Sequence, residues 1–450
     1  MTIIKLQTLT ESEFSPWLTN QSPKVQSWAK AAGFTGGSGQ TLLLPDDDGT
    51  VSSVLCGAGG GRDLWTLGGV SQKLGGGRYE LDEDWDEPST RQMAVGFLLG
   101  QYQFTRYLKP KDSSVELVLP EAWAEEVECQ VQATALVRDL VNTPAEHMGP
   151  AELAQATEAL AEDFGADVEQ VVGDELLTRN YPAIHIVGRA AEQKPRLIRL
   201  RWGKPSDPLV VLVGKGVCFD SGGLNMKNGA GMALMKKDMG GAAHVLGVAR
   251  LIMQHKLPIQ LKVLISAVEN AVSGNAYRPG DVIATRKGSS IEIGNTDAEG
   301  RLVMSDALTL ACEMSAELII DFATLTGAAR VAMGPDVPPF FTNHDGVAED
   351  LLAASAAVQD PLWRLPLYQP YREMLKSSVA DMNNVGGSAF AGCITAALFL
   401  EHFVTDNIPW VHIDTYAWNQ ANRPGRPKGG EALGMRAVFE LLRKRYAPPS

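Results

Sequence analysis

The alternation of long apolar strands with helices in the last two-thirds of the chain restricts the fold more than any other feature. Residues 208–216, PLVVLVGKG, form a continuous apolar run that predicts a strand buried on both faces. A helical pattern at 240–258 ends at a proline, and the apolar segment 259–270 predicts another strand. The same order continues through further helices and strands at 301–315, 316–328, 391–404 and 409–418. This alternation predicts an α/β fold with a mostly parallel central sheet flanked by helices.

The preceding part of the chain has a less regular pattern. Residues 1–117 contain clustered glycines and short apolar runs such as TLLL at 41–44, which predict a smaller N-terminal α/β domain. The glycine cluster GAGGGR at 57–62 could cradle a phosphate, but no lysine follows it, so turns explain it better. Residues 118–137 have helical spacing and predict a linking helix, which leaves 138–450 as the larger domain.

Composition and charge are those of a soluble globular protein. Of the 450 residues, 45% are apolar, and no stretch reaches the roughly 18 consecutive apolar residues of a membrane span. The formal net charge of −13 disfavours bulk attraction to nucleic acid or anionic lipid. The five cysteines are widely spaced, and the first residues lack the basic segment of a signal peptide. We therefore expect reduced thiols and a cytoplasmic location.

Charged residues collect after the predicted strands and before the predicted helices. Lys215 and Asp220 follow the first buried strand, Lys227 comes shortly after them, and Asp238 directly precedes a helix. The segment NTDAEGRL at 295–302 then places three more charged residues before another helix, namely Asp297, Glu299 and Arg301. Because ligands of open α/β sheets bind at the carboxyl ends of the strands, these side chains are candidates for one site.

Each of these residues also has a simpler structural interpretation. Asp238 and Asp297 could be helix N-caps, a position that favours aspartate. The lysines could lie on the surface, and Arg301 could pair with Glu299, although an exposed ion pair contributes only about 0–1 kcal/mol. Taken together, however, the residues favour a binding site, because four carboxylates at one edge of a sheet would repel one another without cations.

The ligand types indicate which ions such a site would bind. Carboxylates without cysteine or histidine suit hard or borderline divalent ions such as Mg, Mn or Zn. Four carboxylates suit two ions, which in such centres lie about 3.5–4 Å apart. The small residues Ala298 and Gly300 leave room for the carboxylates to converge on one point. The lysines and the arginine would then balance the charge or face an oxyanion.

Other catalytic motifs find less support in the sequence. HExxH, GxSxG and the Walker A pattern GxxxxGK[ST] are absent. Ser221 lies in a glycine turn without an obvious histidine partner, and His244 and His412 lie in apolar runs typical of a core. The carboxylates alone would also permit a two-metal phosphoryl-transfer enzyme, although the chain lacks a phosphate-binding loop.

Several segments together resemble the leucyl aminopeptidases, also called cytosol aminopeptidases. They are VGKGVCFDSGG at 213–223, the following Lys227 and Asp238, NTDAEGRL at 295–302 and ATLTGA at 323–328. The resemblance extends from about residue 137 to the C-terminus, and the short N-terminal part is similar to the peptidase B type. It implies a metal-dependent hydrolase that releases N-terminal residues from peptides, with Leu- or Met-like residues preferred.

The resemblance also implies a metal-binding role for five residues. Asp220 and Glu299 would bridge two divalent ions, Mn or Zn with Mg and Co as alternatives, and Asp297 would complete one site. Lys215 and Asp238 would complete the other. Lys215 would bind as a neutral amine, which requires a strongly lowered pKa.

The remaining implied roles concern catalysis, substrate binding and assembly. Lys227 would stabilise the tetrahedral gem-diolate, and Arg301 would hold a bicarbonate ion that acts as general base. The pocket for the N-terminal side chain would be lined by Met235, Thr324, Leu325 and Gly327. Gly294 replaces a bulkier residue of many relatives, which affects only local packing.

The resemblance also implies an oligomeric state. The family forms homohexamers, so we expect a homohexamer here. Some relatives have DNA-binding or regulatory roles, and the acidic charge makes that role the second hypothesis.

Overall fold

The apolar run that follows Pro208 forms the central strand of a large sheet. Strand β8, Leu209–Asp220, is buried along nearly its whole length and pairs in parallel with β9, Gln260–Asn270, and with β12, Leu318–Ala323. Strand β12 pairs in parallel with β16, Trp410–Asp414. The eight strands follow the order β14-β13-β16-β12-β8-β9-β7-β6. The α/β class with a parallel centre is therefore confirmed.

The outer strands of this sheet run antiparallel. Strands β6, Asp167–Val172, and β7, Arg196–Trp202, pair antiparallel with each other, and β7 pairs antiparallel with β9. On the other side, β13, Pro339–Thr342, runs antiparallel to β16 and is followed by the two-residue strand β14, Trp363–Arg364. β6 and β7 are only partly buried, which suits antiparallel edges because such strands tolerate one solvated face.

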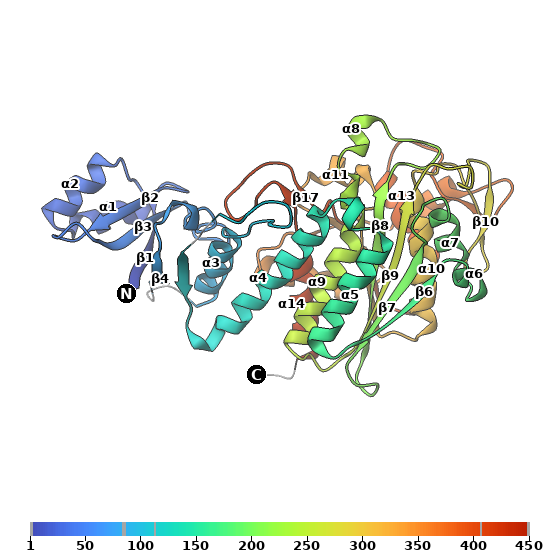
Figure 1. Cartoon of the computed structure of the whole chain (residues 1–450), viewed down its shortest axis with the longest axis horizontal. Helices are drawn as coiled ribbons and strands as arrows, with labels where there is room; N and C mark the ends of the chain where they lie inside the picture. The colour runs from blue at the N-terminus through green and yellow to red at the C-terminus, as the bar shows by residue number, and fades with distance from the viewer. Residues whose placement is uncertain (1–2, 83–86, 112–113, 406, 448–450) are drawn as a thin grey trace. The chain divides into compact units, whose positions relative to one another are not determined.

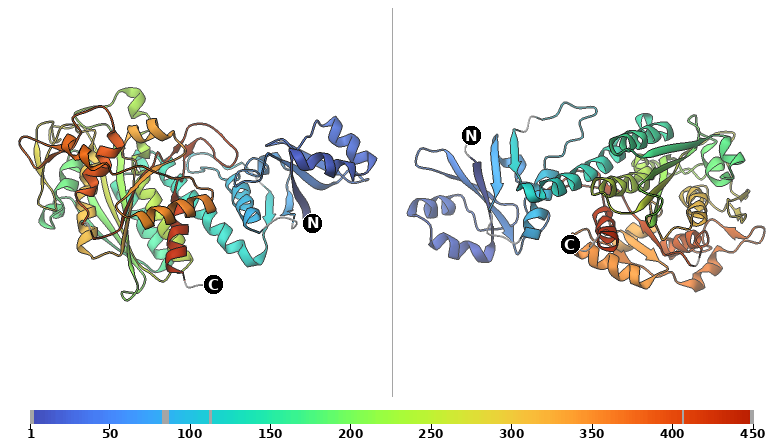
Figure 2. Two further views of the ribbon diagram at one scale, coloured as in Figure 1. Left: turned by 180° about the vertical axis from the view of Figure 1, so that it is seen from behind. Right: turned by 90° about the horizontal axis from the view of Figure 1, so that it is seen from below.

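Helices cover both faces of the sheet, as Figures 1 and 2 show. On one face α9, Gly240–Gln254, packs against β8 and β12, and α5, Pro150–Phe164, and α14, Met435–Tyr446, lie beside it. The other face carries α10, Glu299–Glu313, which packs against β8 and β9 and against two helices. These helices are α7, Pro182–Gly188, and α13, Gly392–Glu401.

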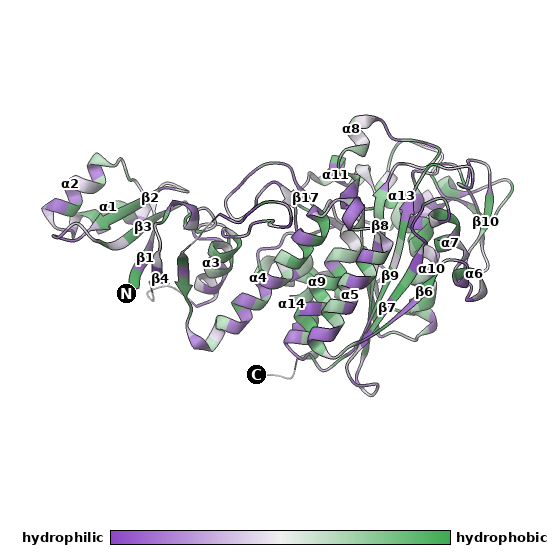
Figure 3. Ribbon diagram, in the orientation of Figure 1, coloured by the Kyte–Doolittle hydropathy of each residue, from purple (hydrophilic) through white to green (hydrophobic). Residues whose placement is uncertain are grey.

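Helix α5 illustrates how the local sequence sets the bounds of an element. Pro150 occupies the first turn, where its missing N–H costs nothing, and the Glu152 carboxylate accepts a hydrogen bond from Gly149 N at 3.0 Å. The helix ends at Gly165, which has a left-handed φ of 63°. Figure 3 shows polar and apolar bands alternating along α5, as expected for a helix with one face on the sheet.

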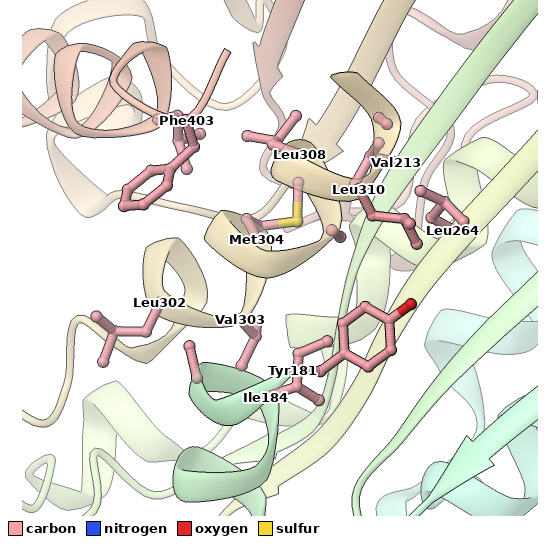
Figure 4. Close-up of a cluster of buried hydrophobic side chains, with 14 of the residues drawn as sticks. Tyr181, Ile184, Val213, Leu264, Leu302, Val303, Met304, Leu308, Leu310 and Phe403 are labelled. Carbon is pink, nitrogen blue, oxygen red and sulfur yellow. The ribbon is translucent and has the colours of Figure 1, made fainter. Parts of the chain in front are cut away.

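The main core lies between α10 and the sheet. Figure 4 shows Leu302, Met304 and Leu308 of α10 among apolar side chains of neighbouring elements, including Val213 of β8 and Leu264 of β9. Helix α10 is buried from Glu299 through Ala311, so its polar first turn is enclosed as well. Each fully buried leucine contributes about 1.5–3 kcal/mol, which fixes the helix firmly beneath the strand ends.

The computed structural model describes residues 3–82, 87–111, 114–405 and 407–447, and within it the chain forms two compact units. The first comprises Met1–Ala135 with Asn419–Gly429, and the second comprises Leu136–Trp418 with Gly430–Ser450. Helix α4, Glu121–Asn142, spans the first transition, and the short strands β17, Trp418–Asn419, and β18, Gly429–Gly430, lie at the later ones. The predicted domains 1–117 and 138–450, with a helix at 118–137, stay a prediction.

The first unit is built on a five-stranded sheet of order β2-β3-β1-β4-β5. Its middle strands are parallel, and β2 runs antiparallel to β3. The strands are β1, Ile3–Thr10, β2, Thr41–Pro45, β3, Val51–Gly59, β4, Gly77–Leu81, and β5, Val115–Val118. The helices are α1, Glu11–Thr19, α2, Pro23–Ala31, and α3, Glu87–Leu99.

The second unit contains several shorter elements besides its main sheet. A small sheet joins β10, Val282–Ala284, β11, Ser290–Glu292, and β15, Met382–Asn383. The other helices are α6, Glu175–Thr178, α8, Gly229–Met232, α11, Gly327–Met333, and α12, Asp345–Ala357. His244 and His412 are fully buried, in agreement with their apolar context. None of the helices in the described part of the chain combines the length and the apolarity that a bilayer crossing needs.

Candidate metal centre

The carboxyl ends of β8, β12 and β16 lie at a cavity of about 260 Å³ in the second unit. Six of the seven charged residues singled out in the sequence line it, namely Lys215, Asp220, Lys227, Asp238, Asp297 and Glu299. Lys215 and Asp220 belong to β8, and Glu299 is the first residue of α10. Segments that are up to 84 positions apart in sequence numbering, from 215 to 299, therefore converge on one cavity.

Three carboxylates form the centre of the site. Asp220, Asp297 and Glu299 each offer an oxygen atom, and these atoms lie within 4.8 Å of one another. Burial and the nearby Asp220 charge raise the pKa of Asp297 and raise that of Glu299 well above its usual value. Glu299 Oε2 is buried without a hydrogen-bond partner among the described residues. A buried acceptor of this kind next to two other carboxylates fits a divalent cation.

Lys215 links Glu299 of this centre to a fourth carboxylate, that of Asp238. Its Nζ lies 2.7 Å from Asp238 Oδ2 and 2.9 Å from Glu299 Oε1, and it donates to Thr324 O at 3.0 Å. Burial alone would lower the pKa of the Lys215 amine. The Asp238 and Glu299 carboxylates outweigh this effect, so the pKa of Lys215 is raised. The lysine is therefore held in place by acidic neighbours rather than lying on the surface.

Lys227 bridges the other two carboxylates of the site. Its Nζ lies 2.8 Å from Asp220 Oδ2 and 2.5 Å from Asp297 Oδ1. Burial alone would lower the pKa of the Lys227 amine, but the Asp220 and Asp297 carboxylates outweigh this effect and raise it. The other Asp220 oxygen accepts hydrogen bonds from Gly222 N at 2.9 Å and from Asn270 Nδ2 at 2.8 Å. Asn270, at the end of β9, thus fixes the orientation of Asp220, and the sequence analysis missed it.

The helix-capping interpretation of two aspartates is wrong. Helix α9 follows Met239 and helix α10 follows Ala298, and neither of these positions makes a side-chain capping bond. Asp238 instead lies in a 3₁₀ turn, Met235–Met239, where its Oδ1 accepts a hydrogen bond from Thr324 Oγ1 at 2.7 Å. Asp297 precedes α10 and faces the cavity.

The structure explains why residue 300, in the segment NTDAEGRL, is a glycine. A Cβ atom on Gly300 would lie 2.6 Å from Lys215 Cε and 2.8 Å from Lys215 Nζ, closer than such atoms can approach. Glycine at this position therefore leaves the space that the Lys215 side chain occupies. The predicted room beside the carboxylates is used at least in part by a lysine.

Arg301 lies outside the lining of the cavity, unlike the other charged residues. Its Nη1 donates to Asn384 O at 2.8 Å, and its guanidinium lies 6.0 Å from the centre of the Phe399 ring. Burial lowers its pKa to about 10, so it remains charged at neutral pH. No ion pair with Glu299 is formed, and Arg301 Nε is buried without a hydrogen-bond partner within the described ranges.

The four predicted pocket residues line the same cavity as the carboxylates: Met235, Thr324, Leu325 and Gly327. Asp414, at the end of β16, holds their loop and was missed by the sequence analysis. Its Oδ1 accepts hydrogen bonds from Leu325 N at 2.9 Å and Thr326 N at 3.2 Å, and its Oδ2 accepts one from Thr326 Oγ1 at 2.7 Å. Asp414 lies in the middle of the strand predicted at 409–418, so its position in the sequence did not mark it as a site residue.

An α/β sheet with buried carboxylates and lysines at its strand ends defines a class of candidate metal-dependent enzymes. Family comparison makes this more specific. Residues 135–439 match the model of the cytosol aminopeptidase family catalytic domain, and residues 4–120 match the N-terminal domain of M17 aminopeptidases. The chain therefore belongs to the cytosol aminopeptidase family and is a hydrolase that acts on peptides.

Individual relatives cover almost the whole chain. Peptidase B of Serratia proteamaculans (strain 568) is 39% identical over 435 residues, which are 94% of this chain and 97% of that protein. The crystal structure of the cytosol aminopeptidase from Coxiella burnetii is 50% identical, with a TM-score of 0.96 over 99% of this chain and 98% of that one. The bottromycin maturation enzyme BotP in complex with Mn is 32% identical, with a TM-score of 0.89 over 99% and 100% of the chains. The predicted resemblance is thus confirmed.

Proposed function

We propose that the chain is a dinuclear metalloaminopeptidase that releases N-terminal residues, Leu- or Met-like ones among them, from peptides. The observation that carries the proposal is the convergence of Asp220, Asp297 and Glu299 within 4.8 Å beside two lysines. The Mn bound to BotP, a structural relative, supports divalent ions as cofactors. Mn or Zn is our first choice, with Mg and Co as alternatives.

The proposed ligands divide between two ions. Asp220 and Glu299 would bridge them, Asp297 would complete one site, and Lys215 with Asp238 would complete the other. The ions, when bound, would acidify a water molecule, polarise the scissile carbonyl and bind the free α-amine of the peptide. Lys215 can act as a ligand only as a neutral amine, a form that burial and nearby dications would favour and the carboxylates oppose.

Two cationic residues would serve the reaction beside the ligands. Lys227, held between Asp220 and Asp297, would offset the charge that develops on the carbonyl oxygen. Arg301 would hold a bicarbonate ion, which supplies a general base when bound. The buried and unpaired Nε of Arg301 supports this role, because it is a donor that an anion could satisfy.

The decisive variant is Glu299→Gln, which keeps the size of the side chain and removes its charge. We expect it to lose bound metal and peptidase activity together, because a bridging ligand serves both ions. Glu313→Gln, at the other end of α10 and in an exposed ion pair with Arg286, is the matched control. Metal content by mass spectrometry and turnover of a leucyl amide are the measurements. Full activity and full metal content of Glu299→Gln would contradict the proposal.

The remaining proposals concern assembly and location. By family resemblance we propose a homohexamer in the cytoplasm, and sedimentation should then give six times the chain mass of 48.4 kDa. We do not expect binding to nucleic acid, because the net charge of −13 repels phosphates. The comparisons give no support to a DNA-binding or regulatory role.

A further inference from the structure

Two loops that carry residues of the proposed mechanism meet at the carboxylate site. Residues 221–228, the lysine loop, connect the end of β8 to α8 and include Lys227. Residues 293–298, the aspartate loop, connect β11 to α10 and include Asp297. Because Lys227 Nζ lies 2.5 Å from Asp297 Oδ1, the position of the amine depends on how the two loops are joined.

Asn225 and Thr296 join the loops by reciprocal hydrogen bonds. The backbone N–H of Asn225 donates to Thr296 Oγ1 at 2.8 Å, and the backbone N–H of Thr296 donates to Asn225 Oδ1 at 2.8 Å. The Thr296 hydroxyl in turn donates to Gly222 O at 2.6 Å. The lysine loop is therefore attached to the aspartate loop at two of its residues, both of which precede Lys227.

Thr296 is a fixed point for this attachment. It is fully buried, and its carbonyl oxygen accepts hydrogen bonds from Asn270 Nδ2 at 3.0 Å and from Tyr277 Oη at 2.6 Å. With the contacts to the lysine loop, each of its polar atoms takes part in a hydrogen bond. A buried network in which every group is satisfied holds its members in one arrangement. Asn270 belongs to the same network and also orients Asp220.

The lysine loop is compact enough to transmit the position of Asn225 to Lys227. The backbone N–H of Lys227 donates to Ser221 O at 2.9 Å, which closes the loop on itself. Gly222 has a left-handed φ of 88°, and a Cβ atom there would lie 2.6 Å from Asn225 O and 2.9 Å from Lys227 N. The backbone atoms of the loop are thus in close contact, so a shift of residue 225 would also move residue 227.

We propose that Asn225 is a positioning residue for the peptidase reaction, which holds the Lys227 amine at the carboxylate site through its hydrogen bonds to Thr296. The proposal rests on the aminopeptidase function proposed above and adds a residue that does not line the cavity. Stabilisation of a developing oxyanion requires a donor that is already in place. A displacement of about 1 Å can reduce the rate on the order of 100-fold. Loss of the Asn225 bond should therefore slow catalysis.

The first test replaces Asn225 by leucine, which has a similar size and cannot accept a hydrogen bond. Asn225 is exposed, so Asn225→Leu should fold. With Mn-loaded enzyme and a leucyl aminocoumarin amide, we expect kcat to fall about 10–100-fold and KM to change less than about twofold, because the Asn225 bond serves the transition state. Asn225→Ala, which adds no apolar bulk, is measured in parallel and should show the same loss.

Asn228→Leu is the matched control. Asn228 is exposed, lies next to Lys227 in the same loop, and accepts a hydrogen bond from Gly231 N at 2.8 Å as the cap of α8. Because it has no bond to Thr296, its replacement should leave kcat near the wild-type value. A kcat for Asn225→Leu and Asn225→Ala equal to that of the control would overturn the proposal and leave the peptidase intact. A wild-type enzyme that hydrolyses no leucyl amide would overturn the proposed function itself.

Two further measurements separate positioning from damage to the metal centre. Asn225→Asp keeps an oxygen that can accept from Thr296 N, so it should restore kcat to within about threefold of the wild type. Calorimetric titration of the metal-free proteins should give the same Mn affinity for Asn225→Leu and the wild type, because Asp220 is oriented by Asn270 rather than by Asn225. An Asn225→Asp enzyme as slow as Asn225→Leu, or a parallel loss of Mn affinity and kcat, would overturn the proposal.

A double-mutant cycle tests whether Asn225 acts through Lys227. Lys227→Met should itself lower kcat/KM, since it removes the amine. In that background Asn225→Leu should reduce kcat/KM by less than about twofold further, because the group that it positions is no longer present. Two losses that multiply in the double variant would show that Asn225 acts independently of Lys227 and would overturn the proposal.

Discussion

Gly300 shows how one missing side chain can determine the geometry of a site. It is the second residue of α10, and the atoms of Lys215 occupy the space beside its Cα. Lys215 in turn contacts Asp238 and Glu299. A single methyl group at position 300 would therefore displace the Lys215 side chain and, through it, disturb the two carboxylates that Lys215 contacts.

We expect Gly300→Ala to displace the Lys215 amine and to weaken metal binding on the order of 10–100-fold, as changes next to ligands do. Overpacking should also destabilise the fold by about 1–3 kcal/mol, despite the better helix propensity of alanine. Gly346→Ala is the control, since Gly346 is also the second residue of a helix and its nearest neighbour is the tip of His344, 3.3 Å away. Metal titration and chemical unfolding measure both effects. Equal metal affinity in the two variants would contradict the role of Gly300.

The sequence reveals some residues of the site and conceals others, for a physical reason. Lys215 and Asp297 could be predicted because a charged residue next to a buried strand or helix needs an explanation. Asn270 and Asp414 could not, because each is an ordinary polar residue at the end of an apolar run. Their roles arise only from partners far away in the chain, such as Asn270 on Asp220.

At the scale of elements, a buried ion pair fixes α4 to the segment that follows β18. Arg138 and Glu431 are 0% and 2% exposed, and Arg138 Nη2 lies 3.0 Å from Glu431 Oε1. Helix α4 is thereby joined to a residue nearly three hundred positions later, in the same compact unit. The contact depends on both charges, because neither would be stable in this environment without the other.

We expect Glu431→Gln to lower the free energy of unfolding by about 3–5 kcal/mol, because it leaves the Arg138 guanidinium buried without its carboxylate. Glu373→Gln is the control, since Glu373 and its partner Lys376 are both 70% exposed. That change should cost no more than about 1 kcal/mol. Urea denaturation gives both values, and similar losses in the two variants would show that burial of the pair is unimportant.

The first helix of the chain is expected to depend on pH. The hydrogen bonds from Arg62 lower the pKa of Glu13 from 4.5 to about 2, and Glu13 also accepts a capping bond from Thr10 N. A lowered pKa means that the folded form favours the carboxylate, so the contribution is complete above pH 4.5 and is lost as the pH falls toward 2.

Glu13→Gln should therefore be less stable than the wild type at pH 7, and this difference should shrink between pH 4.5 and 2. Unfolding of the two proteins at a series of pH values measures the difference. Glu11→Gln removes a charge from the same turn without removing the Arg62 contact, and should give a smaller and flatter difference. A gap between wild type and Glu13→Gln that is constant with pH would be inconsistent with the lowered pKa.

Elements differ in how well the sequence predicts them. The central strands could be predicted because continuous apolar runs such as that of β8 are compatible only with burial on both faces. The direction of β7 could not, because its alternating pattern is the same for a parallel or an antiparallel neighbour. The two-residue strands β14 and β15 have no periodicity at all and form only because longer strands lie beside them.

For the whole molecule, metal binding and folding should be linked. The proposed ligands lie on segments from Lys215 to Glu299 that converge only in the folded chain, so ions should bind the folded form preferentially. At a free concentration of 100 times Kd, one ion adds about 2.7 kcal/mol to the free energy of unfolding.

Removal of metal by a chelator should therefore lower the Tm, and Mn should restore it in a concentration-dependent way. In a chain of this size each kcal/mol corresponds to about 2–4 °C or less. Differential scanning calorimetry of the wild type and of Glu299→Gln measures the effect, and the variant should respond weakly. A wild-type Tm that is insensitive to both chelator and Mn would argue against the metal centre.

The position of β16 in the sheet has a consequence for the time at which activity can first appear. This strand lies between β12 and β13, and its last residue, Asp414, holds the loop that begins at Leu325. A chain still on the ribosome, with Asp414 not yet made, has all the proposed metal ligands but no support for the substrate loop. The proposed site therefore becomes complete only near the end of translation.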